Sequence, residues 1–246
     1  FLDGKAPFST QMSFDNAGFL VGRGGKEVHT ILVALDITET VVEEAAQAGA
    51  ELTVSHHPVI FLPAKHITDQ DPSGRKLLAL LEYNIAAICA HTNLDIAPGG
   101  VNDALAQALG LEQIGPFSED GLGRTGVISG ALSAEAFAAQ VKERLGANGV
   151  RFVDGGRLVC KVAVGGGACG EYAPLAASLG CDTFVTADLK YHDFQNAPAL
   201  GLNLLDAGHF PTENVVCPVL ADYIRRRFPG VVVSLSRVHR EVFRCL

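Results

Sequence analysis

Three features that the 246-residue chain lacks narrow its possible functions. No apolar run approaches the roughly 18 residues that a membrane-spanning helix needs, and no signal peptide is recognisable. The six cysteines include no C-x-x-C pair, and most lie inside apolar segments, as buried reduced thiols do. We therefore expect a cytoplasmic protein that does not use the membrane as a partner. The chain also lacks an initiator Met, so we expect that Phe1 is not its natural start.

A basic surface for nucleic acid is also missing. The formal net charge is −8 and the pI is about 5.4, and Lys and Arg are scattered apart from Arg225 to Arg227. A phosphate backbone binds clustered positive charge, so this pattern disfavours nucleic acid as a partner. The arginine run falls in a predicted helix, where we interpret it as a solvated face.

What the chain does contain is a regular alternation of short apolar runs and amphipathic segments. "HTILVALDI", "AELTVS" and "IAAICA" alternate with "TETVVEEAAQAG" and "SGRKLLALLEYN", a rhythm of strand and helix that predicts a parallel sheet covered on both faces. We predict N-caps at Thr40 and Ser73, and C-terminal glycines at Gly49 and Gly110.

The chain is predicted to form two α/β lobes that function as one unit. Residues 1–112 form the first lobe, the turn-rich residues 113–126 a connector, and residues 127–246 the second lobe. Residues 150–164 suit a hairpin that turns at Asp154, Gly155 and Gly156, which adds antiparallel pairing to the second sheet. The predicted fold class is α/β, with mixed, mainly parallel sheets and a metal cleft between the lobes.

An internal similarity indicates that the lobes are related. "AAQAGAELTVSHH" (45–57) aligns with "AASLGCDTFVTAD" (176–188) at an offset of 131 residues. Each segment contains a helix end, a glycine, an apolar strand and then polar residues. This pattern favours two similar α/β halves.

Polar groups that could bind a metal follow several predicted strands. Parallel strands place their chemistry at their carboxyl ends. His56 and His57 follow "LTVS", His91 and Asp95 follow "IAAICA", and His209 and Glu213 follow "LNLLDAG".

The spacing of these groups points to two metal ions. Adjacent residues on a strand point to opposite faces, so His56 and His57 are expected to serve different ions. Two ions need a bridging anion, and the carboxylate of Glu213, in the first turn of a predicted helix, has two oxygens for that role.

The same motifs resemble the Nif-three-like family, also known as the GTP cyclohydrolase 1 type 2 or YbgI-like family. "SFDNAGFLVG" is similar to that family's N-terminal signature, and further matches follow in order over essentially the whole chain: "ILVALDIT", "SHHPVIF", "HTNLD", "VTADLKYHDF" and "GHFPTE".

The resemblance implies a dinuclear centre with five ligands: His56, His57, Asp95, His209 and Glu213. It favours His57 and Asp95 on one ion, His56 and His209 on the other, and Glu213 as the bridge. His91 would carry protons or support the ligands, and Lys190 and His192 would line the substrate rim. The resemblance also implies a toroidal homohexamer.

The expected chemistry is metal-dependent hydrolysis, because a pair of metal ions activates water. The resemblance implies a GTP cyclohydrolase type 2-like reaction that opens a nucleotide imidazole ring, while the donor set would equally suit a phosphoester or an amide. Imidazole and carboxylate donors without thiolate suit Zn, Fe, Mn or Ni.

Two other interpretations remain open. Gly165, Gly167 and Gly170 fit G-x-G-x-x-G, with Asp188 at the end of the next strand, as in dinucleotide-binding oxidoreductases. Alternatively, the protein is a non-enzymatic metal-binding scaffold or chaperone, whose metal ions would have no open coordination position for water.

Overall fold

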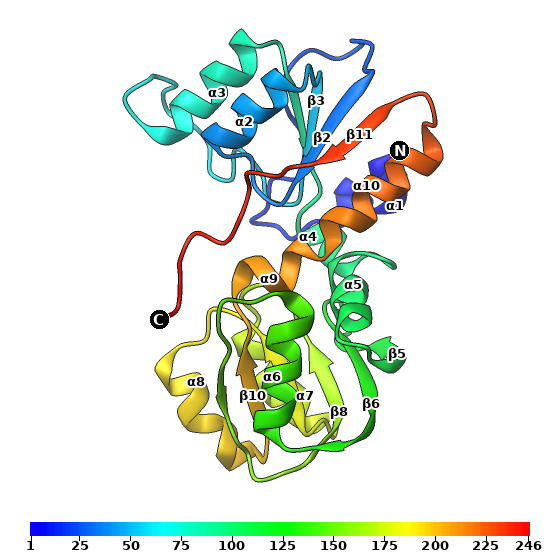
Figure 1. Cartoon of the computed structure of the whole chain (residues 1–246), viewed down its shortest axis with the longest axis vertical. Helices are drawn as coiled ribbons and strands as arrows, with labels where there is room; N and C mark the ends of the chain where they lie inside the picture. Colours follow the sequence, from blue (N-terminus) through cyan, green and yellow to red (C-terminus); the bar gives the residue numbers. More distant parts are fainter. The chain divides into compact units, whose positions relative to one another are not determined.

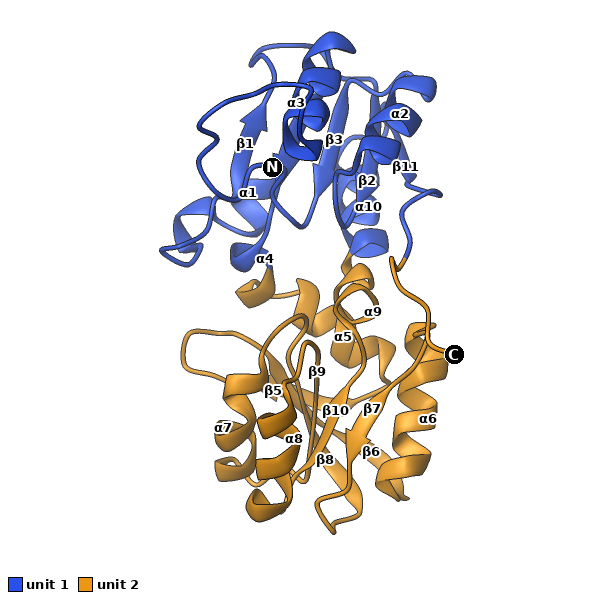
Figure 2. Cartoon of the chain, turned by 90° about the vertical axis from the view of Figure 1, so that its left-hand side faces the viewer, with its two compact units in different colours: residues 1–94, 217–240 blue, residues 95–216, 241–246 orange.

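The computed structural model describes residues 1–246, and the chain divides into two compact units (Figure 2). Unit 1 comprises residues 1–94 and 217–240, and unit 2 comprises residues 95–216 and 241–246. None of the helices combines the length and the apolar character needed to cross a lipid bilayer.

The boundaries of these units differ from those of the predicted lobes in two places, the predicted connector and the C-terminal segment. Residues 217–240 belong to unit 1 because β11 (Val232–Leu235) pairs in parallel with β2 (Thr30–Ala34). The predicted connector belongs to unit 2, where it contains most of β5 (Glu112–Pro116) and the start of β6 (Arg124–Leu132). Turn-forming residues mark where a chain bends, but strand pairing over long sequence distances decides which unit it joins.

Unit 1 is built on a five-stranded sheet in the order β1-β4-β3-β2-β11, in which β1 alone is antiparallel to its neighbour. Figure 1 labels β2, β3 and β11 of this sheet. Its other strands are β1 (Gly18–Val21), β3 (Leu52–Ser55) and β4 (Ala86–Cys89). Its helices are α1 (Leu2–Lys5), the 3-10 turn η1 (Phe8–Thr10), α2 (Glu39–Gln47), α3 (Pro72–Glu82), the start of α4 (Thr92–Ile96) and most of α10 (Val216–Arg227).

The two faces of this sheet bury different residues, as alternation along strands requires. Leu32 and Ala87 pack in the core with the apolar faces of α2 and α3. On the other face Ile31 and Val54 lie with Ile224 of α10. A sheet covered on both faces is therefore confirmed for unit 1.

The helices of unit 1 begin at caps other than the predicted ones. The side chain of Thr38 accepts a hydrogen bond from the Val41 amide, and Asp71 accepts one from Gly74, with Pro72 in the first turn of α3. The predicted caps, Thr40 and Ser73, lie inside the helices because each helix begins before them. Gly49 and Gly110 adopt positive φ after their helices, as predicted.

Unit 2 is built on a six-stranded sheet in the order β5-β6-β8-β9-β10-β7, with a parallel centre, β8-β9-β10, and antiparallel edges. Its remaining strands are β7 (Arg151–Val153), β8 (Val159–Val164), β9 (Thr183–Thr186) and β10 (Asn203–Asp206). Its helices are α5 (Val101–Ala108), α6 (Ala134–Leu145), η2 (Gly170–Tyr172), α7 (Ala173–Ser178), α8 (Tyr191–Asn196), η3 (Ala197–Leu200) and α9 (His209–Asn214).

Helices cover both faces of the second sheet as well. Phe137 of α6 and Leu105 of α5 pack with Val162 and Val185 in one core cluster. Figure 2 shows α6 on one side of this sheet and α7 and α8 on the other. The fold is therefore α/β with two mixed sheets, as the sequence predicts.

The predicted hairpin at Asp154 to Gly156 is wrong. β8 pairs with β6 and β9, whereas β7 pairs with β10 at the far edge of the sheet. The connection crosses beside Leu202, whose backbone leaves no room for a Cβ at Gly155, and Asn203 accepts a hydrogen bond from the Gly155 amide. Gly155 thus serves a close backbone crossing, while Gly156, with a φ of 80° and open space around it, lets the loop bend.

The internal similarity corresponds to a repeated structural arrangement. In unit 1, β2-α2-β3-α3-β4 forms three adjacent parallel strands, and β8-α7-β9-α8-β10 does the same in unit 2. The aligned segments 45–57 and 176–188 each supply the middle strand. Equivalent strand ends therefore carry His57 in unit 1 and Asp188 in unit 2.

Candidate metal centre

Three histidines gather at the carboxyl edge of the first sheet. His56 and His57 follow β3, and His91 follows β4, its parallel neighbour, in register at Ser55 and Cys89. Their ring centroids are 5.0 to 5.5 Å apart, and one ring nitrogen of each lies within 4.8 Å of the others. These residues form the first donor group.

Each imidazole of this group has its Nδ1 atom engaged. His57 Nδ1 lies 2.7 Å from Asp36 Oδ1, His91 Nδ1 lies 2.7 Å from Asp15 Oδ1, and His56 Nδ1 lies 2.8 Å from the carbonyl oxygen of Ala90. A carbonyl or carboxylate oxygen only accepts, so Nδ1 carries the hydrogen. In the neutral rings Nε2 therefore carries the lone pair that a metal ion needs.

Both carboxylates are held in the ionised form. Burial by itself would raise the pKa of Asp36, but hydrogen bonds from His239 and His57 outweigh it and keep that pKa well below its usual range. Burial opposes ionisation of Asp15 in the same way, and hydrogen bonds from Thr92 and His91 keep its pKa below the usual value. Negative charge beside Nδ1 makes these histidines better ligands.

His91 is held neutral in this environment. Burial lowers its pKa, the nearby His56 adds to the effect, and the hydrogen bond to Asp15 only partly offsets them. A neutral ring can accept a proton at Nε2. His91 therefore suits a role as proton carrier or as an additional donor.

Unit 2 holds a second donor group, formed by Asp95, His209 and Glu213. His209 and Glu213 lie one turn apart on α9, where His209 Nε2 is 3.0 Å from Glu213 Oε2, and an oxygen of Asp95 lies within 4.8 Å of one of Glu213. His209 Nδ1 lies 2.7 Å from Asp188 Oδ2, so the two atoms that face each other are His209 Nε2 and the Glu213 carboxylate. Glu213 is buried, with 5% of its side chain exposed.

The glycine-rich loop packs against this second group rather than forming a free anion-binding turn. Asn102 accepts a hydrogen bond from the Gly166 amide, and Thr212 accepts one from the Gly167 amide. The helix that follows the loop is only six residues long and begins after a 3-10 turn. Because these amides are already bonded inside the protein, the structure does not favour the dinucleotide-binding interpretation.

Cys169 lies close to the second group without becoming a thiolate. Burial raises its pKa strongly, and the charges of Asp95 and Glu213 raise it further. Its thiol instead donates to the carbonyl oxygen of Gly166. The donors of both groups are thus imidazole and carboxylate, as the sequence predicts.

Lys190 and His192 make local contacts at α8. The Lys190 amide donates to Asp193, and His192 Nδ1 lies 3.0 Å from Gln195 Oε1. Both side chains are exposed, and their role at a substrate rim stays a prediction.

Sequence reasoning missed the carboxylates that orient the histidines. Asp36 lies two residues after the end of β2, so the strand-end argument that found His56 could have found it. In the sequence, Asp188 stands out only as the polar end of an apolar strand and as part of the dinucleotide-binding pattern, and Asp15 only as part of the N-terminal signature.

Comparisons with known proteins identify the family of this chain. The profile of the family described as Duf34/NIF3 (NGG1p interacting factor 3) matches residues 1–241. The chain belongs to the Duf34/NIF3 family. A NIF3-family relative from Clostridium perfringens, named GTP cyclohydrolase 1 type 2 homolog, is 34% identical over 92% of this chain and 89% of its own length. One with the same name from Streptomyces coelicolor is 37% identical over 86% of this chain and 79% of its own length.

Solved NIF3-like structures extend the match to the whole fold. A hypothetical protein of Staphylococcus aureus superposes with a TM-score of 0.94 at 30% identity, covering 100% of this chain and 96% of that one. The protein titled reduced HcgD from Methanocaldococcus jannaschii gives a TM-score of 0.83 at 30% identity, covering 97% and 95%. The family resemblance read from the sequence is therefore confirmed.

Proposed function

We propose that this NIF3-family protein binds two divalent metal ions and uses them to hydrolyse a small-molecule substrate. The proposed ligands are His56, His57, Asp95, His209 and Glu213, with Glu213 shared between the ions. One observation carries the proposal. All four histidines of the two donor groups have Nδ1 bonded to a fixed acceptor, which leaves Nε2 as the only position for a ligand.

The donor chemistry fits such ions. Imidazole nitrogen and carboxylate oxygen are the preferred donors of Zn, Fe, Mn and Ni, and the nearby Cys169 stays a thiol. Glu213 offers two oxygens, with Oε2 near His209 and Oε1 near Gly167. Two carboxylates also offset the charge of two ions better than imidazoles alone.

The protein's own groups would divide the work of hydrolysis. When bound, a pair of divalent ions lowers the pKa of a water molecule toward neutrality. Asp36, Asp15 and Asp188 hold the rings of His57, His91 and His209 in one orientation. His91, neutral and partly buried, would accept or return a proton at Nε2.

The names of the relatives support a nucleotide as the substrate. We propose that the reaction resembles opening of the imidazole ring of GTP, with phosphoesters and amides as further classes to screen. Lys190 and His192 are exposed cationic or hydrogen-bonding groups that could line the substrate rim. We also propose that the chain assembles as a homohexamer, which the sequence resemblance supports.

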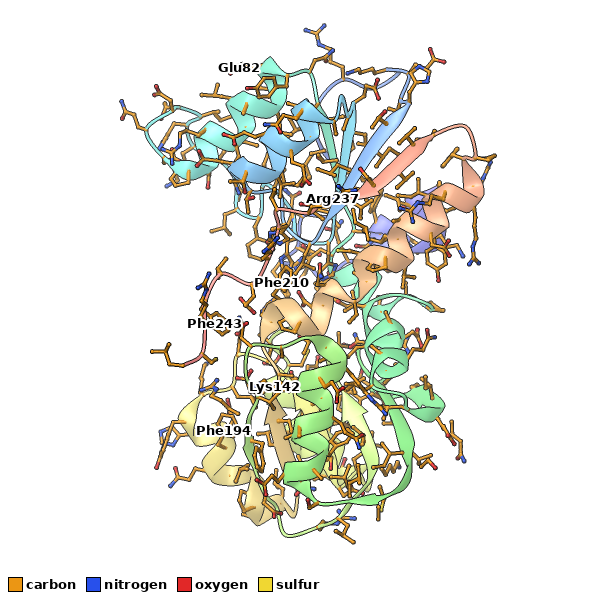
Figure 3. All side chains as sticks on the ribbon, viewed as in Figure 1. Glu82, Lys142, Phe194, Phe210, Arg237 and Phe243 are labelled. Carbon is orange, nitrogen blue, oxygen red and sulfur yellow. The ribbon has the colours of Figure 1, made fainter.

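Elemental analysis of the purified protein tests the metal site first. We expect about two transition-metal ions per chain, and loss of at least one in Asp95→Ala and in Glu213→Ala. Glu82→Ala is the matched control, because Glu82 is an exposed carboxylate at the end of α3 (Figure 3). A wild-type protein without metal, prepared without chelators, would overturn the proposal.

A substrate screen then separates enzyme from scaffold. Formate release from GTP, or phosphate release from phosphoesters, should require metal and disappear in Glu213→Ala. Two tightly bound ions without turnover of any substrate would instead favour the non-enzymatic metal-binding scaffold or chaperone.

A further inference from the structure

Asp36 connects the metal ligand His57 to the far end of the chain. Its Oδ1 atom lies 2.7 Å from His57 Nδ1, and its Oδ2 atom lies 2.9 Å from Nε2 of His239. Each carboxylate oxygen therefore faces one imidazole. His239 is almost fully buried, with 7% of its side chain exposed, whereas 40% of the Asp36 side chain is exposed.

The position of His239 is fixed by a hydrogen-bonded turn after β11. The His239 amide donates to Ser236 Oγ at 3.1 Å, and Ser236 Oγ in turn donates to Glu44 of α2 at 2.5 Å. The Arg237 amide donates to the other oxygen of Glu44 at 2.8 Å. Figure 3 marks Arg237 on the segment that leaves β11. The turn is thus attached to a helix of the same unit.

The two carboxylates that orient histidines of the first donor group are anchored in different ways. The second oxygen of Asp15 accepts from the amide and the hydroxyl of Thr92, the residue next to His91. Asp36 has no such neighbour beside His57, and its second oxygen accepts instead from His239, more than two hundred residues along the chain. Asp36 is only partly buried, so without an anchor on its second oxygen its carboxylate could rotate and would orient His57 less well.

We propose that His239 is a positioning residue for the metal centre, which acts through Asp36 to fix the ring of His57. This inference rests on the proposed function, because His57 matters here as a metal ligand. The Asp36 amide also points at His239 Nε2, at 3.2 Å. Because an ionised carboxylate oxygen can only accept, the shorter contact of 2.9 Å places the hydrogen on Nε2, which donates it to Oδ2. The C-terminal segment is then part of the support of the metal centre.

Metal affinity of the full chain tests the proposal directly. Wild type, His239→Ala and His239→Gln are stripped of metal and titrated with Co²⁺ against a competing chelator, and the visible absorption of bound Co²⁺ is recorded. We expect His239→Ala to weaken the binding of one ion by about 10- to 100-fold and to alter the Co²⁺ spectrum. His239→Gln, whose amide can donate to Asp36, should recover most of the affinity.

Two further variants separate positioning from folding. Ser236→Ala releases the turn while keeping His239 itself, so it should shift affinity in the same direction by a smaller factor. His29→Ala removes an exposed histidine whose ion pair with Glu27 is 3.9 Å long, and it should leave affinity and spectrum unchanged. Circular dichroism of each metal-free variant verifies that it is folded.

The outcomes distinguish this inference from the proposed function. If wild type binds Co²⁺ while His239→Ala binds it with the same affinity and spectrum, His239 is only structural and the inference falls. If wild type binds no metal, the proposed function falls and the inference falls with it. Lower thermal stability in His239→Ala with unchanged metal binding also counts against a positioning role.

Discussion

Gly167 lies so close to Glu213 that a side chain at position 167 would displace the Glu213 carboxylate. A Cβ atom at Gly167 would fall well inside van der Waals contact with Glu213 Oε1, and close to Cε1 of His209. The loop at Gly167 therefore fixes where the Glu213 carboxylate can lie. This contact explains the glycine at this position better than phosphate binding does.

Replacing Gly167 should disrupt the second donor group. Gly167 has a φ of 66°, so Gly167→Ala should cost about 1–2 kcal/mol in backbone strain and also move the Glu213 carboxylate. Gly180→Ala is the matched control, because Gly180 has a φ of 75° with open space around it. We expect backbone strain to destabilise both variants, a larger loss of unfolding free energy in Gly167→Ala because of the added clash, and loss of bound metal only in Gly167→Ala. Equal metal content in the two variants would contradict the prediction.

Asp188 should control metal affinity through His209. Asp188→Ala removes the acceptor of His209 Nδ1, which should lower affinity for one ion by about 10- to 100-fold. Asp188→Asn keeps an acceptor oxygen and tolerates the positive φ of 55° at this position, so it should retain more affinity. Chelator competition measures both values, and nitrogen NMR of His209 reports the ring tautomer. Equal affinity in the two variants would count against the orienting role.

The ion pair between Arg124 and Asp103 should contribute strongly to the stability of unit 2. Two guanidinium nitrogens lie 2.7 and 2.9 Å from the two carboxylate oxygens, and only 10% of the Arg124 side chain is exposed. Arg124→Ala leaves Asp103 without this partner, so we expect a loss of about 3–5 kcal/mol in urea unfolding. Arg226→Ala, which breaks an exposed pair with Asp222, should cost less than about 1 kcal/mol. Similar losses of unfolding free energy in the two variants would contradict the prediction that the buried pair contributes more than the exposed one.

Glu51 should make the unfolding free energy of the protein fall as the solution becomes acidic. The hydrogen bond from the Thr30 amide outweighs desolvation and holds the pKa of Glu51 below its usual value of 4.5. The folded-state pKa is depressed, so the stabilising effect is present above pH 4.5 and is lost as the pH falls through the folded pKa. Wild type should therefore exceed Glu51→Gln in unfolding free energy near pH 7, and the gap should close as the pH falls through the depressed folded-state pKa of Glu51. A gap that stays constant with pH would exclude this role.

The proposed homohexamer predicts a particle of six times the chain mass of 25.8 kDa. Size-exclusion chromatography with light scattering measures this mass without a shape assumption. Glu213→Ala should have the same mass as wild type if assembly does not depend on metal. A monomer at micromolar concentration would contradict the proposal.

Local sequence patterns predicted much of this fold because they reflect local physics. Alternating apolar segments gave the strands and helices around β2, β3 and β4, and Arg225 to Arg227 form an exposed end of α10, as expected. The predicted helix caps are wrong because the side chains of Thr38 and Asp71, rather than those of Thr40 and Ser73, accept hydrogen bonds from first-turn amides. The wrong hairpin has a different cause, since the pairing of β7 with β10 joins segments about fifty residues apart.

The candidate ligands could be named from the sequence alone, because each lies in a segment that follows an apolar strand, and that position is a local property. The position of Glu213 differs from the prediction, since α9 begins at His209 and Glu213 lies near its end. Only the tertiary structure identified what orients them. Asp36 reaches His57, Asp15 reaches His91, and both partners lie far along the chain. A hydrogen bond needs two groups within about 3 Å in space, and no spacing in the sequence specifies that for residues from different strands. The sequence by itself therefore determined the candidate donors, and tertiary packing decided which ring nitrogen each of these histidines leaves available.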